Sequence, residues 1–451
     1  MENTEAPVLP HAEHLSEPDW FKKTKAALSS VNVRPEYGVI VKAVGTVIYA
    51  RLGDVSIGEI CLLDDPSSGV KLEAKVVGFA DGLKLLMPLG DLAGLSPSTK
   101  VVPISKRPEI LVGDSLLGRV VGSDGRPVDG LGDVTASTRW ASERNPPDAM
   151  RRPLIDTVLQ TGIRAIDGLL TCGEGQRFGI FSEPGVGKST LLAEIVRSAD
   201  VDVSVVGLVG ERGREAREFI EQGLGAEGLS KSTVVLSTSD RPALERLEAV
   251  NTATAIAEYH RDKGRRVLLL IDSITRYARA TREVGLAAGE VPTRRGFPSS
   301  TFAHLPKVLE RAGCSDRGSI TAFYTVLVEG DGTADPVAEE TRGILDGHIV
   351  LSSDLASAEH YPAIDVLQSK SRVMTRVASV DHQRAAGRMR KLLAEYKNAE
   401  LLIRMGEYEQ GADPDVDEAI EKMSMIKGFL CQAPGDKAHF SETVQLLTKL
   451  V

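Results

Sequence analysis

The segment SEPGVGKST at residues 182–190 constrains the fold more than any other part of the chain. It follows the apolar run FGIF and precedes the helical pattern TLLAEIV, so we expect a buried strand, a glycine turn and a helix in succession. Gly185 and Gly187 allow the backbone N–H groups to converge on an anion, and the helix start adds partial positive charge. This pattern is a phosphate-binding loop (P-loop), although Ser182 stands where the pattern has its first glycine.

The P-loop pattern also assigns two side-chain roles. Lys188 is expected to reach the β- and γ-phosphates of a nucleotide, and the Ser189 hydroxyl to bind Mg²⁺. The P-loop therefore predicts a nucleoside triphosphate with Mg²⁺ as the bound species. The eight histidines include no HExxH, and His11 and His14 have no evident third ligand, so we expect no metal site beyond Mg²⁺.

Residues 105–373 surround this loop with a regular alternation of strands and helices. Short apolar runs indicate strands that are buried on both faces, and the helical stretches between them indicate right-handed crossovers. A parallel α/β sheet is therefore predicted for this part of the chain. The runs are FGIF, VSVVGLVG, STVVL, RVLLLID and SITAFYTVLV, with TLLAEIVRSA and NTATAIAEYHRDKG among the helices.

The two flanks of this core have different patterns. Residues 34–104 contain short β-branched runs separated by Gly, Asp and Pro turns, which predicts a small antiparallel β-barrel. Residues 374–451 lose the strand pattern and show apolar residues at helical spacing, which predicts a helical bundle with an acidic, solvated helix start at 413–421. Residues 1–33 are polar and proline-containing and are expected to form a loose arm.

Composition narrows the functional classes. The net charge is −9, whereas proteins that work mainly by neutralising phosphate backbones are usually basic. The four cysteines contain no CxxC pair, so a disulfide framework is not expected and a reducing compartment fits. There is no apolar run of about 18 residues, so we expect a cytoplasmic chain that meets a membrane through partners.

Carboxylates follow two of the predicted strands. Asp272 ends RVLLLID, at the sheet edge where ligands bind in α/β folds, and such an Asp holds Mg²⁺ in P-loop proteins. GERGREAREF follows VSVVGLV and supplies acidic and basic side chains that could orient water and meet phosphate charge. Taken alone, that charge run is more often a solvated helix start.

Arg276, Arg279 and Arg282 are interpreted by default as a solvated helix face, with a subunit interface or central pore as the alternative.

Seven segments in order carry a family resemblance: SEPGVGKST, GERGRE, LLLIDSITRYARA, PTRRGFP, LPKVLERAG, ILDGHIVLS and HYPAIDVLQSKSRVM. From about residue 34 to the C-terminus the chain resembles the family that joins F-type and type III secretion ATPases, and it is more similar to the type III secretion members. The resemblance implies an N-terminal β-barrel, a RecA-like P-loop core and a C-terminal α-helical domain, in agreement with the boundaries 34–104, 105–373 and 374–451.

The resemblance also implies individual roles. Residues Gly185, Val186, Gly187, Lys188, Ser189 and Thr190 would hold the phosphates. Glu211 would activate water, with Arg212 near the γ-phosphate, and Glu215 and Asp272 would hold Mg²⁺ through its waters. Tyr361 would stack on adenine, although a half-buried core tyrosine is the plainer interpretation. Arg372 would be an arginine finger that reaches the nucleotide of a neighbouring subunit.

These implications predict an ATPase that works as a homohexameric ring and energises protein export at the base of a type III secretion apparatus. The expected partners are the stalk, stator and export-gate proteins and chaperone–cargo complexes, at the cytoplasmic side of the inner membrane. Direct nucleic-acid binding is not expected. Three alternatives stay open at this point: a flagellar export ATPase, the catalytic subunit of a rotary ATP synthase, and an RNA motor of the Rho type. The last is disfavoured because residues 34–104 carry seven Lys/Arg against eight Asp/Glu and few aromatics.

Overall fold

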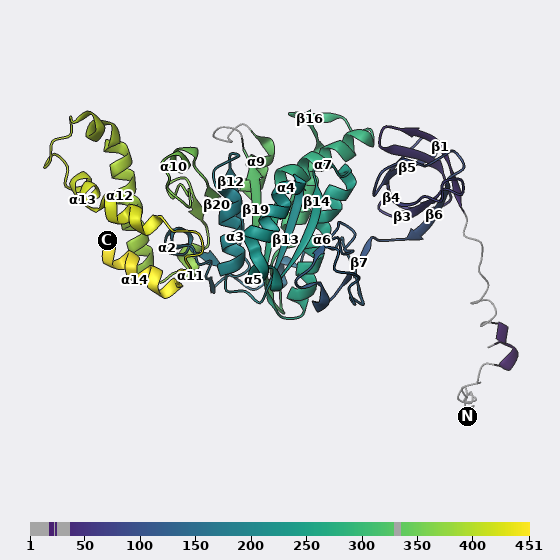
Figure 1. The fold of residues 1–451 in the computed structure, drawn as a ribbon, viewed down its shortest axis with the longest axis horizontal. Helices are drawn as coiled ribbons and strands as arrows, with labels where there is room; N and C mark the ends of the chain where they lie inside the picture. The colour runs from purple at the N-terminus through teal and green to yellow at the C-terminus, as the bar shows by residue number, and fades with distance from the viewer. Residues whose placement is uncertain (1–17, 22, 25–36, 329–334) are drawn as a thin grey trace, which may run out of the picture.

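The computed structural model describes residues 18–21, 23–24, 37–328 and 335–451. A barrel lies at one end, a sheet covered by helices lies in the middle, and a group of helices lies at the other end (Figure 1). The predicted fold class is confirmed by this arrangement. The arm predicted for residues 1–33, with His11 and His14, lies almost entirely outside the described residues.

The N-terminal barrel is closed and antiparallel, in the order β1-β2-β5-β4-β3-β6. Alternating residues place one face of each strand inside, so that Ile48, Leu63 and Leu86 are fully buried. Pairing of β1 with β6 closes the barrel and removes its edges. The strands are β1 Gly38–Val44, β2 Val47–Arg51, β3 Ile60–Asp64, β4 Lys71–Ala80, β5 Leu83–Pro88 and β6 Lys100–Ser105.

The central sheet has the order β21-β20-β12-β19-β15-β13-β14-β8, with β18 pairing β19. Pairs from β20 across to β8 are parallel, as the continuous apolar runs predicted. Its strands are β8 Val120–Val121, β12 Arg177–Ser182, β13 Val203–Glu211, β14 Ser232–Thr238, β15 Arg266–Asp272, β18 Gly313–Cys314, β19 Ser319–Leu327, β20 Gly347–Val350 and β21 Lys370–Ser371.

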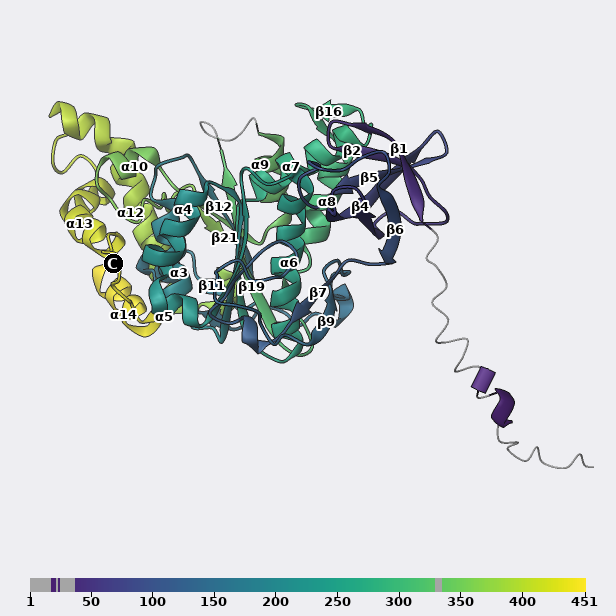
Figure 2. The same cartoon turned by 45° about the vertical axis from the view of Figure 1, so that its right-hand side comes forward.

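Helices cover both faces of this sheet because successive strand residues point to opposite sides. In β15, Leu268 and Leu270 pack with the α3 side, whereas Leu269 and Ile271 pack with α6, α7 and α8. The core helices are α3 Lys188–Ser198, α4 Gly213–Glu218, the π-helix η3 Phe219–Leu224, α5 Gly225–Ser230, α6 Ala243–Asp262, α7 Ile274–Ala287, α8 Ser299–Leu309, α9 Pro336–Ile344, α10 Ser353–Ser357 and α11 Met374–Val377. Figure 2 shows α6, α7 and α8 on the side of the sheet that faces the barrel.

Short elements connect these layers. Strands β7 and β9 pair as an antiparallel ribbon, and β10 and β11 form a second antiparallel pair. The remaining short elements are β7 Glu109–Val112, η1 Asp114–Leu116, β9 Thr138–Ala141, η2 Ala149–Arg151, β10 Val158–Leu159, α2 Arg164–Leu169, β11 Cys172–Gly173, β16 Pro292–Arg294 and β17 Phe297–Pro298.

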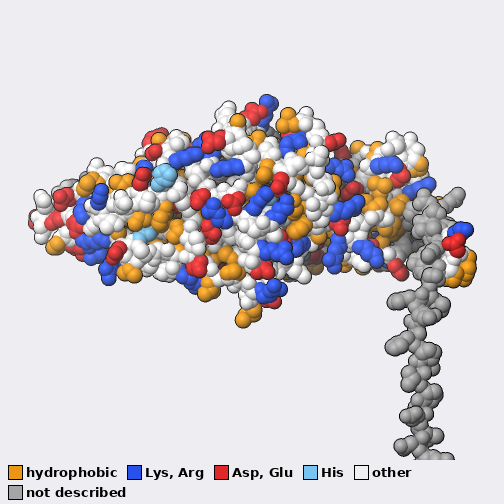
Figure 3. All heavy atoms as spheres, turned by 90° about the horizontal axis from the view of Figure 1, so that it is seen from below, with side chains coloured by type: hydrophobic (Ala, Val, Ile, Leu, Met, Phe, Trp, Pro, Cys, Tyr) orange, Lys and Arg blue, Asp and Glu red, His pale blue; other side chains and the backbone are white. Residues whose placement is uncertain are grey.

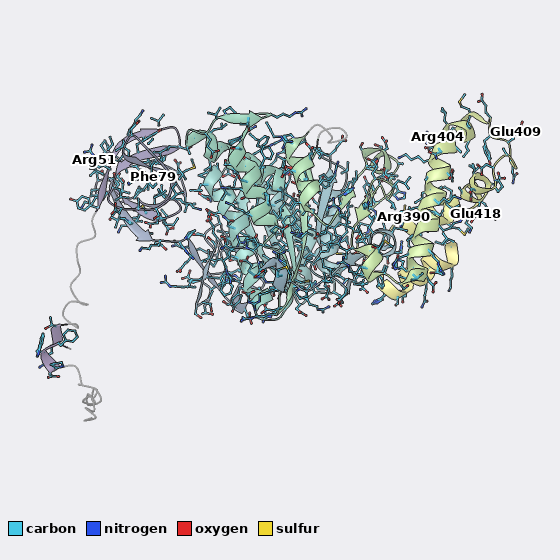
Figure 4. All side chains as sticks on the ribbon, turned by 180° about the vertical axis from the view of Figure 1, so that it is seen from behind. Arg51, Phe79, Arg390, Arg404, Glu409 and Glu418 are labelled. Atoms are coloured by element: carbon cyan, nitrogen blue, oxygen red, sulfur yellow. The ribbon has the colours of Figure 1, made fainter. Side chains whose placement is uncertain are left out.

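Three helices form the C-terminal part: α12 Val380–Met405, α13 Pro414–Leu430 and α14 Phe440–Leu450. The predicted acidic helix start is α13, which Asp413 caps by accepting from the N–H groups of Asp415 and Val416. It is also bound to its neighbour, because Arg388 on α12 pairs with Asp415 at 3.0 Å and with Glu418. Figure 4 shows Arg390 and Glu418 on these two helices, with Arg404 and Glu409 toward the outer end.

The surface carries both signs of charge. Figure 3 shows basic and acidic side chains interspersed along the whole face seen from below. Within the described part of the chain, no helix has the length and apolar character needed to cross a bilayer. All four cysteines are free thiols.

Candidate nucleotide site

The P-loop joins the end of β12 to the start of α3. Gly185 and Gly187 have φ values of 84° and 83°, in the left-handed region where a side chain is strained. Val186 between them is buried in the core and anchors the loop from below. Ser189 and Thr190 are exposed at the first turn of α3, where helix N–H groups are available to an anion.

Lys188 lies between two carboxylates at the C-terminal edge of the sheet. Its Nζ is 2.5 Å from Oδ1 of Asp272 and 3.6 Å from Oε1 of Glu211. Strands β12, β13 and β15 run in parallel, so the residues after each strand meet at one edge. The hydroxyl of Thr325, near the end of β19, donates to the same Asp272 oxygen at 2.7 Å.

Glu211 is buried and incompletely hydrogen-bonded. Burial, with the nearby charge of Asp272, raises the pKa of the Glu211 carboxyl, while Lys188 and Arg276 oppose this rise. Its Oε1 atom is buried without a hydrogen-bond partner. A buried acceptor of this kind normally has a donor, so the site fits a water or metal-bound water at this atom.

Arg212 and Glu215 lie at the rim beside Glu211. Arg212 caps α4, and its Nη1 is 2.7 Å from Oε1 of Glu215. The hydrogen bond and charge of Arg212 lower the pKa of the Glu215 carboxyl, which is therefore anionic at neutral pH. The Arg212 side chain is 78% exposed, and its recognised ion-pair partner is Glu215 of the same helix.

Arg276 is a site residue that our sequence analysis missed. The default prediction of a solvated helix face is wrong here, because Arg276 Nη2 is 3.1 Å from Glu211 Oε2 and its stem packs on Gly210. It is also wrong for Arg282, whose guanidinium lies 5.0 Å from the Phe297 ring, whereas Arg279 is exposed. The available signal was the position of Arg276, in the first turn of the helix that follows Asp272.

Tyr361 packs directly against the P-loop. A Cβ atom at Gly187 would lie 3.1 Å from Cε1 of Tyr361, so glycine is required here by closeness as well as by φ. The Tyr361 side chain remains 37% exposed, and its carbonyl accepts from the N–H of Gln432 at the end of α13. The ring is thus a half-exposed platform beside the loop, tethered to the C-terminal helices.

Arg372 lies away from these groups. Ser371 pairs with Gly347, which pairs in turn with Phe178 near the start of β12. The P-loop begins at Ser182, which is four residues, or about 13 Å, farther along that strand. Arg372 is exposed, and its guanidinium donates to the carbonyl of Arg342 at 3.4 Å.

The donor set fits Mg²⁺ as a companion of the nucleotide. Ser189, Glu211, Glu215 and Asp272 offer oxygen atoms, which Mg²⁺ prefers, around one loop. Across the described residues, no group of three or more His, Cys, Asp or Glu is arranged to hold a metal ion by itself. Phosphate oxygens and waters would therefore complete the coordination.

A glycine loop with a lysine, two strand-end carboxylates and an α/β sheet define a P-loop nucleoside triphosphatase. The family model of the ATP synthase alpha/beta family nucleotide-binding domain matches residues 162–371, and that of the T3SS EscN ATPase C-terminal domain matches residues 378–449. The chain is 54% identical to a type 3 secretion system ATPase of Sinorhizobium fredii, over 93% of each chain. It is 45% identical to a flagellum-specific ATP synthase of Bacillus subtilis, over 95% of this chain and 99% of that protein.

A solved structure gives the same result for the fold. The assembled ATPase EscN, in complex with its central stalk EscO from the enteropathogenic E. coli type III secretion system, has a TM-score of 0.85 and 47% identity. The match covers 92% of this chain and 99% of that one. The chain belongs to the family of type III secretion ATPases, and the predicted resemblance is confirmed.

Proposed function

We propose that this ATPase hydrolyses MgATP in a homohexameric ring and thereby energises protein export through a type III secretion apparatus. The observation that carries the proposal is the convergence of Lys188, Glu211 and Asp272 on one glycine loop. The position of Arg372, away from the loop of its own chain, supports the ring, because an arginine finger at this residue would serve the nucleotide of a neighbouring subunit.

Each site residue has a task in this mechanism. Backbone N–H groups of residues 185–190 hold the phosphates, and Lys188 exchanges Asp272 for the β- and γ-phosphate oxygens. Bound Mg²⁺ neutralises phosphate charge, and Ser189, Glu215 and Asp272 would hold it. Glu211 orients the attacking water through Oε1, and its ionised form accepts the proton.

Charge that develops on the γ-phosphate is met from two sides. Arg212, at the rim of the site, supplies one cation within the chain. Arg372 of a neighbouring subunit supplies the other, since a planar guanidinium engages two phosphate oxygens at once. Tyr361 would stack on adenine from its position beside Gly187.

The partners follow from the family. A central stalk would pass through the ring, because the relative EscN forms a complex with its central stalk EscO. We further propose stator and export-gate proteins and chaperone–cargo complexes as partners, which would hold the ring at the cytoplasmic side of the inner membrane. The chain itself would bind no nucleic acid.

A flagellar export ATPase is the second candidate, favoured by the 45% identity to the Bacillus subtilis protein. It would use the same chemistry with different partners. A rotary synthase subunit would instead need a second chain to supply the finger, and a mass measurement of the assembled particle separates the two arrangements.

Subunit mixing tests the proposal. Arg372→Ala should keep nucleotide affinity and oligomer formation but lose most turnover, as trans fingers contribute about 10³–10⁵-fold. Mixing this variant with Lys188→Ala should restore part of the rate, because an intact loop on one chain then meets an intact Arg372 on the next. Rings shown to be mixed but still inactive would contradict the trans role, and so would full activity of Arg372→Ala alone.

A further inference from the structure

A second cavity, distinct from the nucleotide site, lies between the barrel and the core. It has a volume of about 920 Å³ and is bounded by Ile57 and Val77 of the barrel and by Leu247, Val284 and Val308 of α6, α7 and α8. In Figure 2 these helices lie beside the barrel strands. Its size is that of a small-molecule pocket, and domain interfaces are a common place for one.

The floor of the cavity is a rigid frame of paired charges. Lys75 of β4 bonds to Glu143 and, at 2.6 Å, to Glu248 of α6. Arg311 is 3% exposed and pairs with Glu258 at 2.9 Å. These charges are neutralised where they stand, so they do not attract a ligand. The Lys75 pairs also join the barrel to the core, whereas the Arg311 pair lies within the core.

Two cations at the cavity have no such partner. Arg107, in the linker after β6, and Lys307, on α8, both line the cavity and are exposed. Among the described residues, neither cation has a carboxylate within ion-pair distance. Of the carboxylates that line the cavity, only Glu290 has no described cation within ion-pair distance. The excess charge available to a ligand is therefore positive, and it comes from two segments 200 residues apart in sequence.

We propose that this cavity binds a small organic anion with an apolar body. The valine and leucine walls would hold the body, and Arg107 and Lys307 would hold the anionic group. Nothing in this proposal depends on the role of any nucleotide-site residue.

The test uses a matched pair of fluorescent probes. The anion 8-anilino-1-naphthalenesulfonate and its neutral counterpart N-phenyl-1-naphthylamine share one ring system and differ in the sulfonate. We expect the anion to saturate one site per full-length chain. The double variant Arg107→Glu/Lys307→Glu should weaken its binding by about tenfold or more, because two attractions become repulsions. Affinity for the neutral probe should change by less than about twofold.

A charge-matched control isolates the site from net charge. Lys370→Glu/Lys449→Glu makes the same change in net charge at two exposed lysines that do not line the cavity, and it should leave anion binding within about twofold of the wild type. An equal loss in this control would overturn the proposal. Equal losses for both probes in the cavity variant would overturn the assignment to anions.

Filling the cavity locates the site. Val77→Trp should abolish binding of the anionic probe while ATP turnover and circular dichroism stay normal. Ala288→Phe, at the end of α7, provides the same test from the opposite wall if the first variant does not fold. Unchanged probe binding in a folded filling variant would place the anion elsewhere and contradict the proposal.

Discussion

Two lysines in this molecule each lie between two carboxylates, yet their surroundings differ. Lys188 stands between Asp272 and Glu211, and Lys75 stands between Glu248 and Glu143. Their side chains are almost equally covered, at 13% and 10% exposure. The difference is in what else the carboxylates contact.

Around Lys75 the charged groups are all paired with one another. Both carboxylates make direct bonds to the ammonium group, and Asn251 donates to the second oxygen of Glu248 at 3.3 Å. Burial alone would lower the pKa of Lys75, but Glu248 and Glu143 together raise it, so the charge is permanent. This lysine fastens the barrel to the core.

Around Lys188 the same arrangement leaves one carboxylate oxygen without a hydrogen-bond partner. The second carboxylate is 3.6 Å away, its Oε1 has no hydrogen-bond partner, and the lysine is carried by a glycine turn at a helix start. A lysine between two carboxylates therefore indicates a ligand site only where a hydrogen-bond acceptor is left unsatisfied beside free backbone N–H groups. The next four predictions test this contrast.

The largest expected effect is on catalysis at Lys188. Lys188→Ala should abolish ATP hydrolysis and leave the fold intact, because its ammonium group offsets phosphate charge and stabilises no apolar core. Steady-state phosphate release and circular dichroism measure the two properties. Near-normal turnover would contradict the assignment of Lys188 to phosphate binding.

Glu211→Gln should bind MgATP with near-normal affinity and lose about 10²–10⁴-fold in turnover. The amide keeps the shape of the side chain and loses the charge that polarises water. Equilibrium nucleotide binding and single-turnover kinetics separate the two effects. A variant that fails to bind nucleotide would show instead that Glu211 has a structural or metal-holding role.

Lys75→Met should act on stability and not on chemistry. Removing one partner of a buried ion pair leaves uncompensated carboxylates and costs about 3–5 kcal/mol in the free energy of unfolding. The matched control is Lys71→Met on the same strand, whose ion pair with Asp64 spans 3.8 Å at the surface and is expected to contribute less than about 1 kcal/mol.

Denaturant unfolding and the turnover of the folded fraction distinguish the outcomes for Lys75. Adding Glu248→Gln to Lys75→Met should restore part of the lost stability, since it removes one stranded charge. A Lys75→Met protein with wild-type stability would show that the barrel is held mainly by the apolar contacts around Leu244 and Met87.

The contrast also shows what the sequence could and could not reveal. The P-loop, Asp272 and the parallel strands were predictable because each rests on a local pattern: apolar runs, glycine spacing or a residue directly after a strand. The pair Lys75 and Glu248 is separated by 173 residues, so the contact exists only once the barrel is docked. Arg276 was misassigned because the periodicity of α7 shows which residues share a face but not that this face meets Glu211.

The smallest expected effect is a shift in the pH dependence of activity, caused by removing Arg276, a cation that lowers the pKa of Glu211. Glu211 acts when ionised, and its raised pKa means that activity is lost on the acid side at a higher pH than for an ordinary carboxylate. Arg276 opposes that rise, so Arg276→Gln should move the acid limb of kcat/KM to still higher pH. The slope of the limb stays the same, at most about tenfold per pH unit for one ionisation, and only its position moves. Arg279→Gln, an exposed neighbour on the same helix, should leave the profile unchanged. Profiles measured with saturating Mg²⁺ provide the comparison, and an identical acid limb in Arg276→Gln and the wild type would show that Arg276 does not set the protonation of Glu211.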